Sequence, residues 1–216
     1  MTYHGKVRPG TPAVRELSDL MITKASVGPM DNNAYLLKCR TTDDLLLIDA
    51  AADERVLLGL LNGQPLATVV TTHRHGDHWG ALAAVVAATS ATTVAGADDV
   101  DGIPVPTDRA LRDGDVVSVG DVDLQVISLV GHTPGSVALL YDDPTGPPHL
   151  WTGDSLFPGG VGKTWSADDF SSLIDDVESK IFDRLPDETW VYPGHGDDTT
   201  LGAERPHVRE WRARGW

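Results

Sequence analysis

Three histidines and one aspartate lie within six consecutive residues near the first third of the chain. Imidazole nitrogens and carboxylate oxygens are the ligands that zinc, manganese and iron take from proteins. His73 and His75 are two residues apart in an extended stretch, so their side chains point to the same side. Gly76 allows a sharp turn, which is expected to bring Asp77 and His78 round from the first turn of a helix. One cation cannot easily use all four side chains at this spacing, whereas two cations can.

The segments on either side of this motif predict its place in the fold. Residues 67–72 are apolar and β-branched, which indicates a buried strand. Residues 79–88 are rich in alanine, which favours a helix. The motif therefore occupies the loop at the carboxyl end of a strand, where α/β sheets place their ligands.

Three further candidate ligands repeat one layout later in the chain. Each follows a strand-like segment and stands directly after a glycine: His132, Asp154 and His195. Glycine beside a ligand permits close approach of the backbone to a crowded centre. Two metals need more ligands than the first motif provides, and this repeated layout supplies them.

Taken in order, these motifs resemble the metallo-β-lactamase superfamily, and most of all its glyoxalase II (hydroxyacylglutathione hydrolase) branch. The resemblance extends from Asn32 to His195. It implies an α/β fold, a four-layer αβ/βα sandwich with the metals in a groove along one sheet edge. It also implies two ligand sets and one bridge: His73, His75 and His132 for the first metal, Asp77, His78 and His195 for the second, and Asp154 shared by both. Asp77 is accordingly expected to be essential for catalysis.

Residues around the bridging aspartate distinguish the branches. True metallo-β-lactamases generally lack an aspartate at the Asp154 position, and lactonase relatives carry a tyrosine where Phe157 stands here. Glyoxalase II relatives follow the aspartate with Leu-Phe and Gly-x-Gly-Lys, which match residues 156–157 and 160–163. The resemblance makes Lys163 a substrate-binding residue, together with Trp165, which replaces a family tyrosine. The chain ends about twenty residues after the last ligand, without the extra helical domain of that family, so the thiol carrier stays open.

The expected activity is hydrolysis of a thioester by a hydroxide that bridges two divalent metal ions. Two cations lower the pKa of a shared water and polarise the substrate carbonyl. A thiolate leaving group, whose conjugate acid has a pKa of about 8.5, needs little protonation. An amide leaving group needs a general acid, and every histidine and aspartate of the motifs is assigned to metal. Zinc is the expected metal, with iron and manganese as alternatives, and the acyl group stays open.

Other functions are compatible with these motifs. A persulfide dioxygenase-like enzyme would use one iron, held by His73, His132 and Asp154, in the two-histidine, one-carboxylate arrangement of iron oxygenases. A lactone or ester hydrolase would use the same centre. A non-catalytic metal-binding relative is disfavoured, because such proteins usually lose ligands and all of them are present here.

Composition limits the other possibilities. The 216 residues, 41% of them hydrophobic, are expected to form one domain, residues 1–216. A net charge of −15 disfavours nucleic-acid partners, because phosphate backbones attract basic surfaces. The sequence has no apolar run long enough for a membrane span and no secretory signal, so we expect a cytoplasmic enzyme. Its expected partner is a small-molecule substrate, a thioester or an ester. The oligomeric state stays open. The single cysteine, Cys39, is expected to lie in the core.

The remaining segments give a coarse organisation. Strands are expected within residues 14–38, 45–50, 116–119 and 122–129, and an irregular loop over residues 98–113. Asp53 is a candidate N-cap for a helix that ends at Leu61, and Ser166 for a helix with a buried apolar stripe. The stripe consists of Phe170, Leu173, Ile174, Val177 and Ile181. Three histidines outside the motifs, His4, His149 and His207, are expected at the surface.

Overall fold

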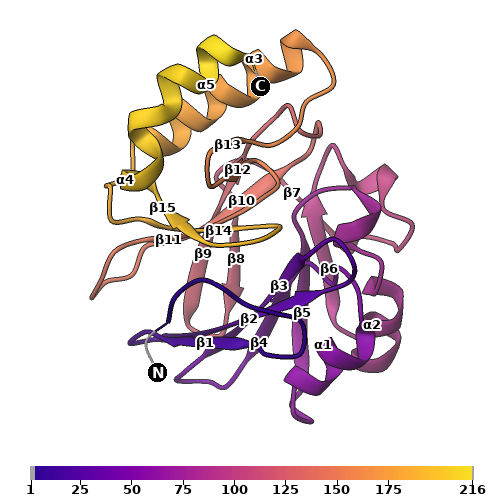
Figure 1. Ribbon diagram of the computed structural model, residues 1–216. Helices are drawn as coiled ribbons and strands as arrows, with labels where there is room; N and C mark the ends of the chain where they lie inside the picture. Colours follow the sequence, from indigo (N-terminus) through magenta and orange to yellow (C-terminus); the bar gives the residue numbers. More distant parts are fainter. Residues whose placement is uncertain (1–2, 216) are drawn as a thin grey trace.

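The computed structural model describes residues 3–215, which form two β-sheets packed face to face with helices on both outer surfaces (Figure 1). One apolar cluster, which includes Ile22 and Trp151, fills the space between the sheets. A second cluster lies beneath α1 (Glu54–Leu60) and α2 (Leu82–Thr89), and a third lies beneath α3 (Ala167–Asp176) and α5 (Val208–Arg214). The predicted four-layer αβ/βα sandwich is therefore confirmed.

The first sheet has seven strands in chain order within the described residues. They are β1 (Ala13–Glu16), β2 (Leu20–Val27), β3 (Asn32–Cys39), β4 (Leu45–Ile48), β5 (Leu66–Thr71), β6 (Thr92–Gly96) and β7 (Arg109–Leu111). The first four strands pair antiparallel, and β4 to β7 pair parallel. In the parallel half, the carboxyl ends of β4, β5 and β6 therefore meet at one edge.

The second sheet has six strands in the order β15-β14-β11-β10-β9-β8 across the same part of the chain. They are β8 (Val116–Val119), β9 (Val122–Ser128), β10 (Val137–Tyr141), β11 (His149–Gly153), β14 (Trp190–Pro193) and β15 (Thr199–Thr200). Only β11 and β14 pair parallel, so the loops after them leave the sheet at the same edge. A short hairpin, β12 (Leu156–Phe157) and β13 (Gly160–Val161), follows β11.

Helices cover the outer face of each sheet. The longer ones are α1 (Glu54–Leu60), α2 (Leu82–Thr89), α3 (Ala167–Asp176) and α5 (Val208–Arg214), and a short α4 covers Leu201–Glu204. Ser166 caps α3 as predicted, since its Oγ accepts a hydrogen bond of 3.1 Å from the Asp169 amide. The predicted apolar stripe of α3 and the following turns is buried. No helix within residues 3–215 is both long and apolar enough to cross a membrane.

Two details of the predicted helices are wrong. Asp77 and His78 do not lie in the first turn of α2 but in a separate 3₁₀ turn, Gly76–His78, which a hydrogen bond from the His78 amide to the His75 carbonyl closes at 3.0 Å. Asp53 precedes α1 but does not cap it, because its φ of 53° is left-handed. Its carboxylate instead accepts from the Gly28 amide at 2.8 Å.

Two other predictions also fail. The segment 98–113 is not wholly irregular, because it contains a 3₁₀ turn at Val100–Gly102 and edge strand β7. His149 is not at the surface: it is fully buried, and its Nδ1 lies 2.9 Å from the Tyr192 hydroxyl. Its place in β11, stacked between Tyr141 and Tyr192, explains its burial. His4 and His207 are exposed, and Cys39 is buried, as expected.

Candidate metal centre

All seven candidate ligands meet where the carboxyl ends of strands from both sheets come together. His73 and His75 lie on the loop after β5, and His132 lies on the loop after β9. Asp154 directly follows β11, and His195 follows β14. Loops of both sheets are brought together because their buried faces pack against one another, so residues about 120 apart in sequence become neighbours.

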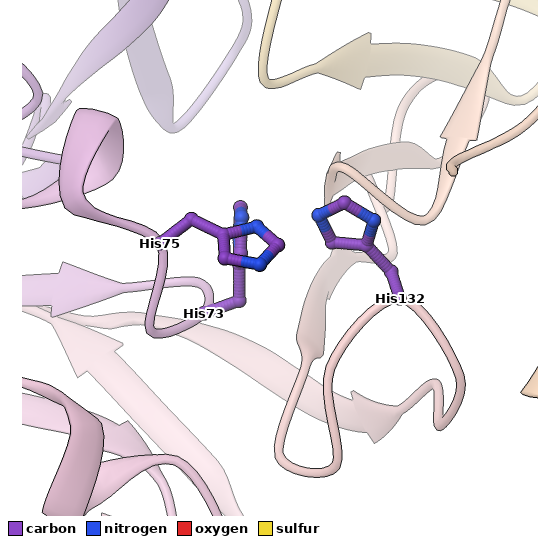
Figure 2. A group of neighbouring side chains, drawn as sticks. All are labelled: His73, His75 and His132. Atoms are coloured by element: carbon purple, nitrogen blue, oxygen red, sulfur yellow. The ribbon is translucent and has the colours of Figure 1, made fainter. Parts of the chain in front are cut away.

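Three imidazoles form a first cluster. His73, His75 and His132 each offer a nitrogen, and these nitrogens lie within 4.8 Å of one another. The ring centroid of His75 is 4.8 Å from that of His73 and 4.6 Å from that of His132, with the rings nearly perpendicular. Figure 2 shows the three rings gathered around one place, two from the loop after β5 and one from the opposite loop.

A second cluster contains Asp77, His78 and His195. Nε2 of His195 lies 3.2 Å from Oδ2 of Asp77 and 3.3 Å from Nε2 of His78. The distance from Oδ2 of Asp77 to Nε2 of His78 is 3.7 Å. One carboxylate and two imidazoles therefore present their ligand atoms to one small space.

The Asp154 carboxylate lies between the two clusters. Its Oδ1 is 3.4 Å from Nε2 of His78, which belongs to the second cluster. Its Oδ2 is 3.6 Å from Nε2 of His132 in the first cluster and 3.5 Å from Nε2 of His195 in the second. One carboxylate thus lies close to ligand candidates of both clusters, the position that the family resemblance implies for a bridge.

This donor set fits divalent cations. Two atoms bound at 2.0–2.2 Å to one tetrahedral ion lie roughly 3.4 Å apart. The separations in the second cluster and around Asp154 are close to this distance. Nε2 of His73 and Nε2 of His132 are buried and have no hydrogen-bond partner within residues 3–215. An unpaired buried nitrogen is unfavourable unless a ligand satisfies it. A metal ion in the first cluster, to which both histidines belong, would satisfy both nitrogens.

Outer hydrogen bonds turn the histidine rings toward the clusters. Nδ1 of His132 donates to the Lys163 carbonyl at 2.7 Å, and Nδ1 of His195 donates to the Met30 carbonyl at 2.9 Å. Nδ1 of His78 lies 2.8 Å from the carboxylate of Asp49. Each contact occupies one ring nitrogen and leaves Nε2 for a metal.

Charge differs between the two clusters. Burial holds the pKa of His73 well below its ordinary value, and nearby His78 lowers it further. Burial also lowers the pKa of His132, so both rings are neutral and present lone pairs. In contrast, although burial opposes it, the Asp49 and Asp154 carboxylates raise the pKa of His78 to about 10. Metal binding at the second cluster must therefore displace a proton.

Sequence motifs did not reveal two residues that position the ligands. Asp49 follows β4 and is buried, and its carboxylate contacts Nδ1 of His78, the ring nitrogen that does not face the cluster. Asn32 begins β3, and its side-chain amide donates to both the carboxylate and the carbonyl of Asp77 at 3.0 Å. Asp49 follows an apolar strand segment, which is the signal that marked the ligand candidates, whereas Asn32 precedes one and carries no such signal.

Two glycines close to Asp154 are required by space, and Gly194, directly before His195, is one of those predicted from the sequence. A Cβ atom at Gly194 would collide with Oδ1 of Asp154 and with the ring of His78. A Cβ at Gly162 would collide with the backbone carbonyl of Asp154. Larger residues at these positions would displace the bridging carboxylate.

Lys163 and Trp165 lie beside the first cluster. The Nζ of Lys163 is 4.4 Å from the centre of the Trp165 ring, and that ring is 6.5 Å from the ring of His75. Trp165 is 66% exposed, which is unusual for so large an apolar side chain. An exposed aromatic ring and a cation thus border the metal centre.

The fold is that of a known family. The model of the metallo-β-lactamase superfamily matches residues 27–195, and the chain belongs to that superfamily, whose members use divalent metals. A relative named hydroxyacylglutathione hydrolase, from Polaromonas sp. (strain JS666 / ATCC BAA-500), is 37% identical over 166 residues, which are 76% of this chain. The chain spans 62% of the length of that relative. The resemblance to the glyoxalase II branch is confirmed.

Two solved structures resemble the chain closely enough to be informative. ETHE1 from Myxococcus xanthus is 30% identical, with a TM-score of 0.75, over 89% of this chain and 84% of that one. TTHA1623, solved in a di-iron-bound form, is 33% identical, with a TM-score of 0.68, over 84% of this chain and 96% of that one.

Proposed function

We propose that the protein is a binuclear metal-dependent hydrolase of thioesters, similar to glyoxalase II. The observation that carries this proposal is the position of Asp154, whose carboxylate oxygens lie 3.4 Å from a ligand of one cluster and 3.6 Å from a ligand of the other. Such a bridge holds two cations together. The relatives named hydroxyacylglutathione hydrolase support the choice of thioesters as substrates.

Two cations in these clusters would lower the pKa of a water between them and polarise a carbonyl. The chain's own residues place and orient that chemistry. Asp77, held by Asn32, contributes a negative charge to the second cluster. The three imidazoles of the first cluster are neutral ligands. A cation bound by them would therefore keep more of its positive charge to polarise a substrate oxygen.

The surroundings of the centre favour a good leaving group. The histidines and aspartates of the motifs all face the clusters, so none of them is free to protonate an amine. A thiolate leaves without such help. The Trp165 ring and the Lys163 head group offer an apolar face and a positive charge beside the first cluster, which suit an anionic thiol carrier.

A substrate panel tests the proposal. Purified protein loaded with zinc, iron or manganese is assayed on acyl thioesters, oxygen esters, lactones and a β-lactam. The proposal expects thioesters to be hydrolysed with the highest kcat/KM and β-lactams to be left unchanged. Asp154→Asn should remove nearly all activity while the circular dichroism spectrum is preserved. Rapid hydrolysis of β-lactams or lactones, with no thioester turnover, would contradict it.

A second candidate is a persulfide dioxygenase-like enzyme with one iron. The specific observation that favours it is the similarity to ETHE1 from Myxococcus xanthus. His73, His132 and Asp154 would hold the iron, because Nε2 of each histidine faces Oδ2 of the aspartate. Oxygen consumption by the iron-loaded protein with a glutathione persulfide distinguishes the two activities. We expect none above the rate of the metal-free protein.

A further inference from the structure

Asp99 is a fully buried aspartate outside the ligand clusters that the function above does not use. It lies three residues after the end of β6, in the segment that was expected to be irregular. Its Oδ2 accepts hydrogen bonds from the Arg74 amide at 3.0 Å and from the Thr133 hydroxyl at 2.5 Å. Its Oδ1 accepts from the Gly135 amide at 2.9 Å. A buried carboxylate is costly unless donors of this kind satisfy it.

Two of these three donors stand next to a metal-ligand candidate. The Arg74 amide belongs to the peptide between His73 and Arg74, in the middle of the His-x-His motif. Thr133 directly follows His132. Because one oxygen of Asp99 serves both donors, it fixes the separation of the two loops that bring together the first cluster.

The surrounding backbone leaves little room for adjustment. A Cβ at Gly135 would collide with the backbone of Asp98 and Asp99, and a Cβ at Gly96 would collide with the Gly135 carbonyl. The loop after β9 therefore packs directly on the segment that carries Asp99. The Arg74 guanidinium lies 3.8 Å from Oδ1 and offsets part of the buried charge.

A backbone hydrogen bond also joins the same two loops. The Val137 amide donates to the Thr72 carbonyl at 2.9 Å, where β10 begins and just after β5 ends. This bond joins the two loops where they meet strands β5 and β10, and not beside the ligand side chains. Asp99 ties them beside the ligands themselves, so its loss should leave the loops joined but free the histidines to shift.

We propose that Asp99 is a positioning residue of the first metal cluster, holding His73 and His75 at the distance from His132 that one cation requires. The proposal rests on the proposed binuclear centre but not on the identity of the substrate. Outer residues that orient metal ligands typically change metal affinity by about 10–100-fold when they are replaced. Asp99 acts through two backbone amides and one hydroxyl, and its hydrogen bonds within residues 3–215 reach no ligand side chain.

The test is metal affinity in the absence of substrate. The metal-stripped protein is titrated with zinc against a chromogenic chelator, and thermal unfolding of the metal-free form is measured in parallel. Asp99→Asn places an amide N–H₂ against a backbone or hydroxyl donor, so we expect one of the two zinc sites to weaken by about 10–100-fold. The other site should keep the wild-type affinity. In protein loaded with cobalt in place of zinc, the visible absorption spectrum reports the coordination geometry of each site. The spectrum of the weakened site alone should change.

Asp108→Asn is the matched control. The Asp108 carboxylate accepts from the amide and hydroxyl of Thr93 at 2.8 and 3.0 Å, in the same stretch of chain, and these donors are far in sequence from every ligand. We expect wild-type zinc affinity from it. Thr133→Val is a milder second variant that keeps the Asp99 charge and removes one donor, and it should weaken the same site several-fold.

Four outcomes are decisive. Weakening of one site by Asp99→Asn and Thr133→Val, with wild-type affinity in Asp108→Asn, supports the proposal. Wild-type affinity at both sites in a folded Asp99→Asn protein would overturn it. If Asp99→Asn does not fold, unchanged affinity in Thr133→Val overturns it equally. A wild-type protein that binds one zinc contradicts the proposed binuclear function instead, and Asp99→Asn must then still weaken that single site.

Discussion

The carboxylate of Asp49 lies 2.8 Å from Nδ1 of His78, and both side chains are buried. The same carboxylate accepts hydrogen bonds of 2.8 Å from the amide and the hydroxyl of Thr72, the residue before His73. A ligand of the second cluster and the backbone leading to the first are therefore held by one group. Such an arrangement fixes the ring orientation and makes the imidazole a stronger donor to a metal.

Asp49→Asn should weaken zinc binding at the second cluster by about 10–100-fold, because His78 loses its charged partner. Turnover should fall with metal occupancy and recover in part at high zinc concentration. The measurement is zinc titration together with kcat at increasing zinc. Undiminished affinity at both sites would show that Asp49 does not orient His78.

A buried ion pair lies behind the loop that carries His195. Nζ of Lys24 is fully buried and donates to Asp198 at 2.6 Å and to the Gly196 carbonyl at 2.7 Å. Lys24→Met leaves Asp198 buried without its cation, which typically costs about 3–5 kcal/mol of unfolding free energy. Urea denaturation of the metal-free protein measures this cost.

Lys6→Met is the control for that experiment, since Lys6 pairs with Asp197 at the surface, where its side chain is 74% exposed. Its effect should stay within about 0.5 kcal/mol. The double variant Lys24→Met/Asp198→Leu should recover part of the loss, because no unpaired charge remains. Similar stabilities for the two lysine variants would contradict the role of the buried pair.

Sequence patterns predicted the parts of this fold that depend on local chemistry. The strand before His73 and the Ser166 cap follow from β-branched residues and from a hydroxyl before an apolar stripe. The meeting of all seven ligand candidates follows from their common place after strands. These signals lie within a few residues of the feature that they predict.

Features that depend on tertiary contacts were missed. Asp53 has the residue type of an N-cap, yet its carboxylate reaches Gly28 in another element. His149 is polar, yet two stacked tyrosine rings surround it. Asp99 lies in a segment rich in aspartate and proline, where nothing in the local sequence distinguishes it from exposed neighbours. In each case a partner distant in sequence determines the environment.

His149 makes a prediction about pH. Its pKa is lowered from 6.5 to about 4, chiefly by burial and also by the Arg15 guanidinium, while Asp143 opposes them. As the pH falls below about 6.5, the unfolded chain takes up this proton first, so the folded state loses stability until the pH reaches about 4. The loss is about 3 kcal/mol.

His149→Gln should remove this part of the pH dependence. The measurement is the unfolding free energy of the metal-free protein between pH 7 and pH 4, with exposed His4→Gln as the control. The wild-type and His4→Gln curves should share the steeper slope. A His149→Gln curve of the same slope would assign the acid sensitivity to other groups.

Lys163→Ala should raise KM several-fold for anionic thioesters, with a smaller effect on kcat, because an exposed charge contact contributes about 1 kcal/mol. The variant keeps the backbone carbonyl that accepts from His132, so the metal ligand stays in place. Steady-state kinetics with a charged and a neutral substrate measures the effect. Lys6→Ala controls for net charge. An equal loss on both substrates would mean that Lys163 supports the loop and does not contact the substrate.

The binuclear centre is tested most directly by anomalous diffraction from crystals of the metal-loaded protein, with data on both sides of the metal absorption edge. The account predicts two anomalous peaks per chain, roughly 3.5 Å apart, one on each side of the Asp154 carboxylate. Elemental analysis of the same preparation should give two metal ions per chain. A single peak among His73, His132 and Asp154, with one iron per chain even after metal supplementation, would contradict the account.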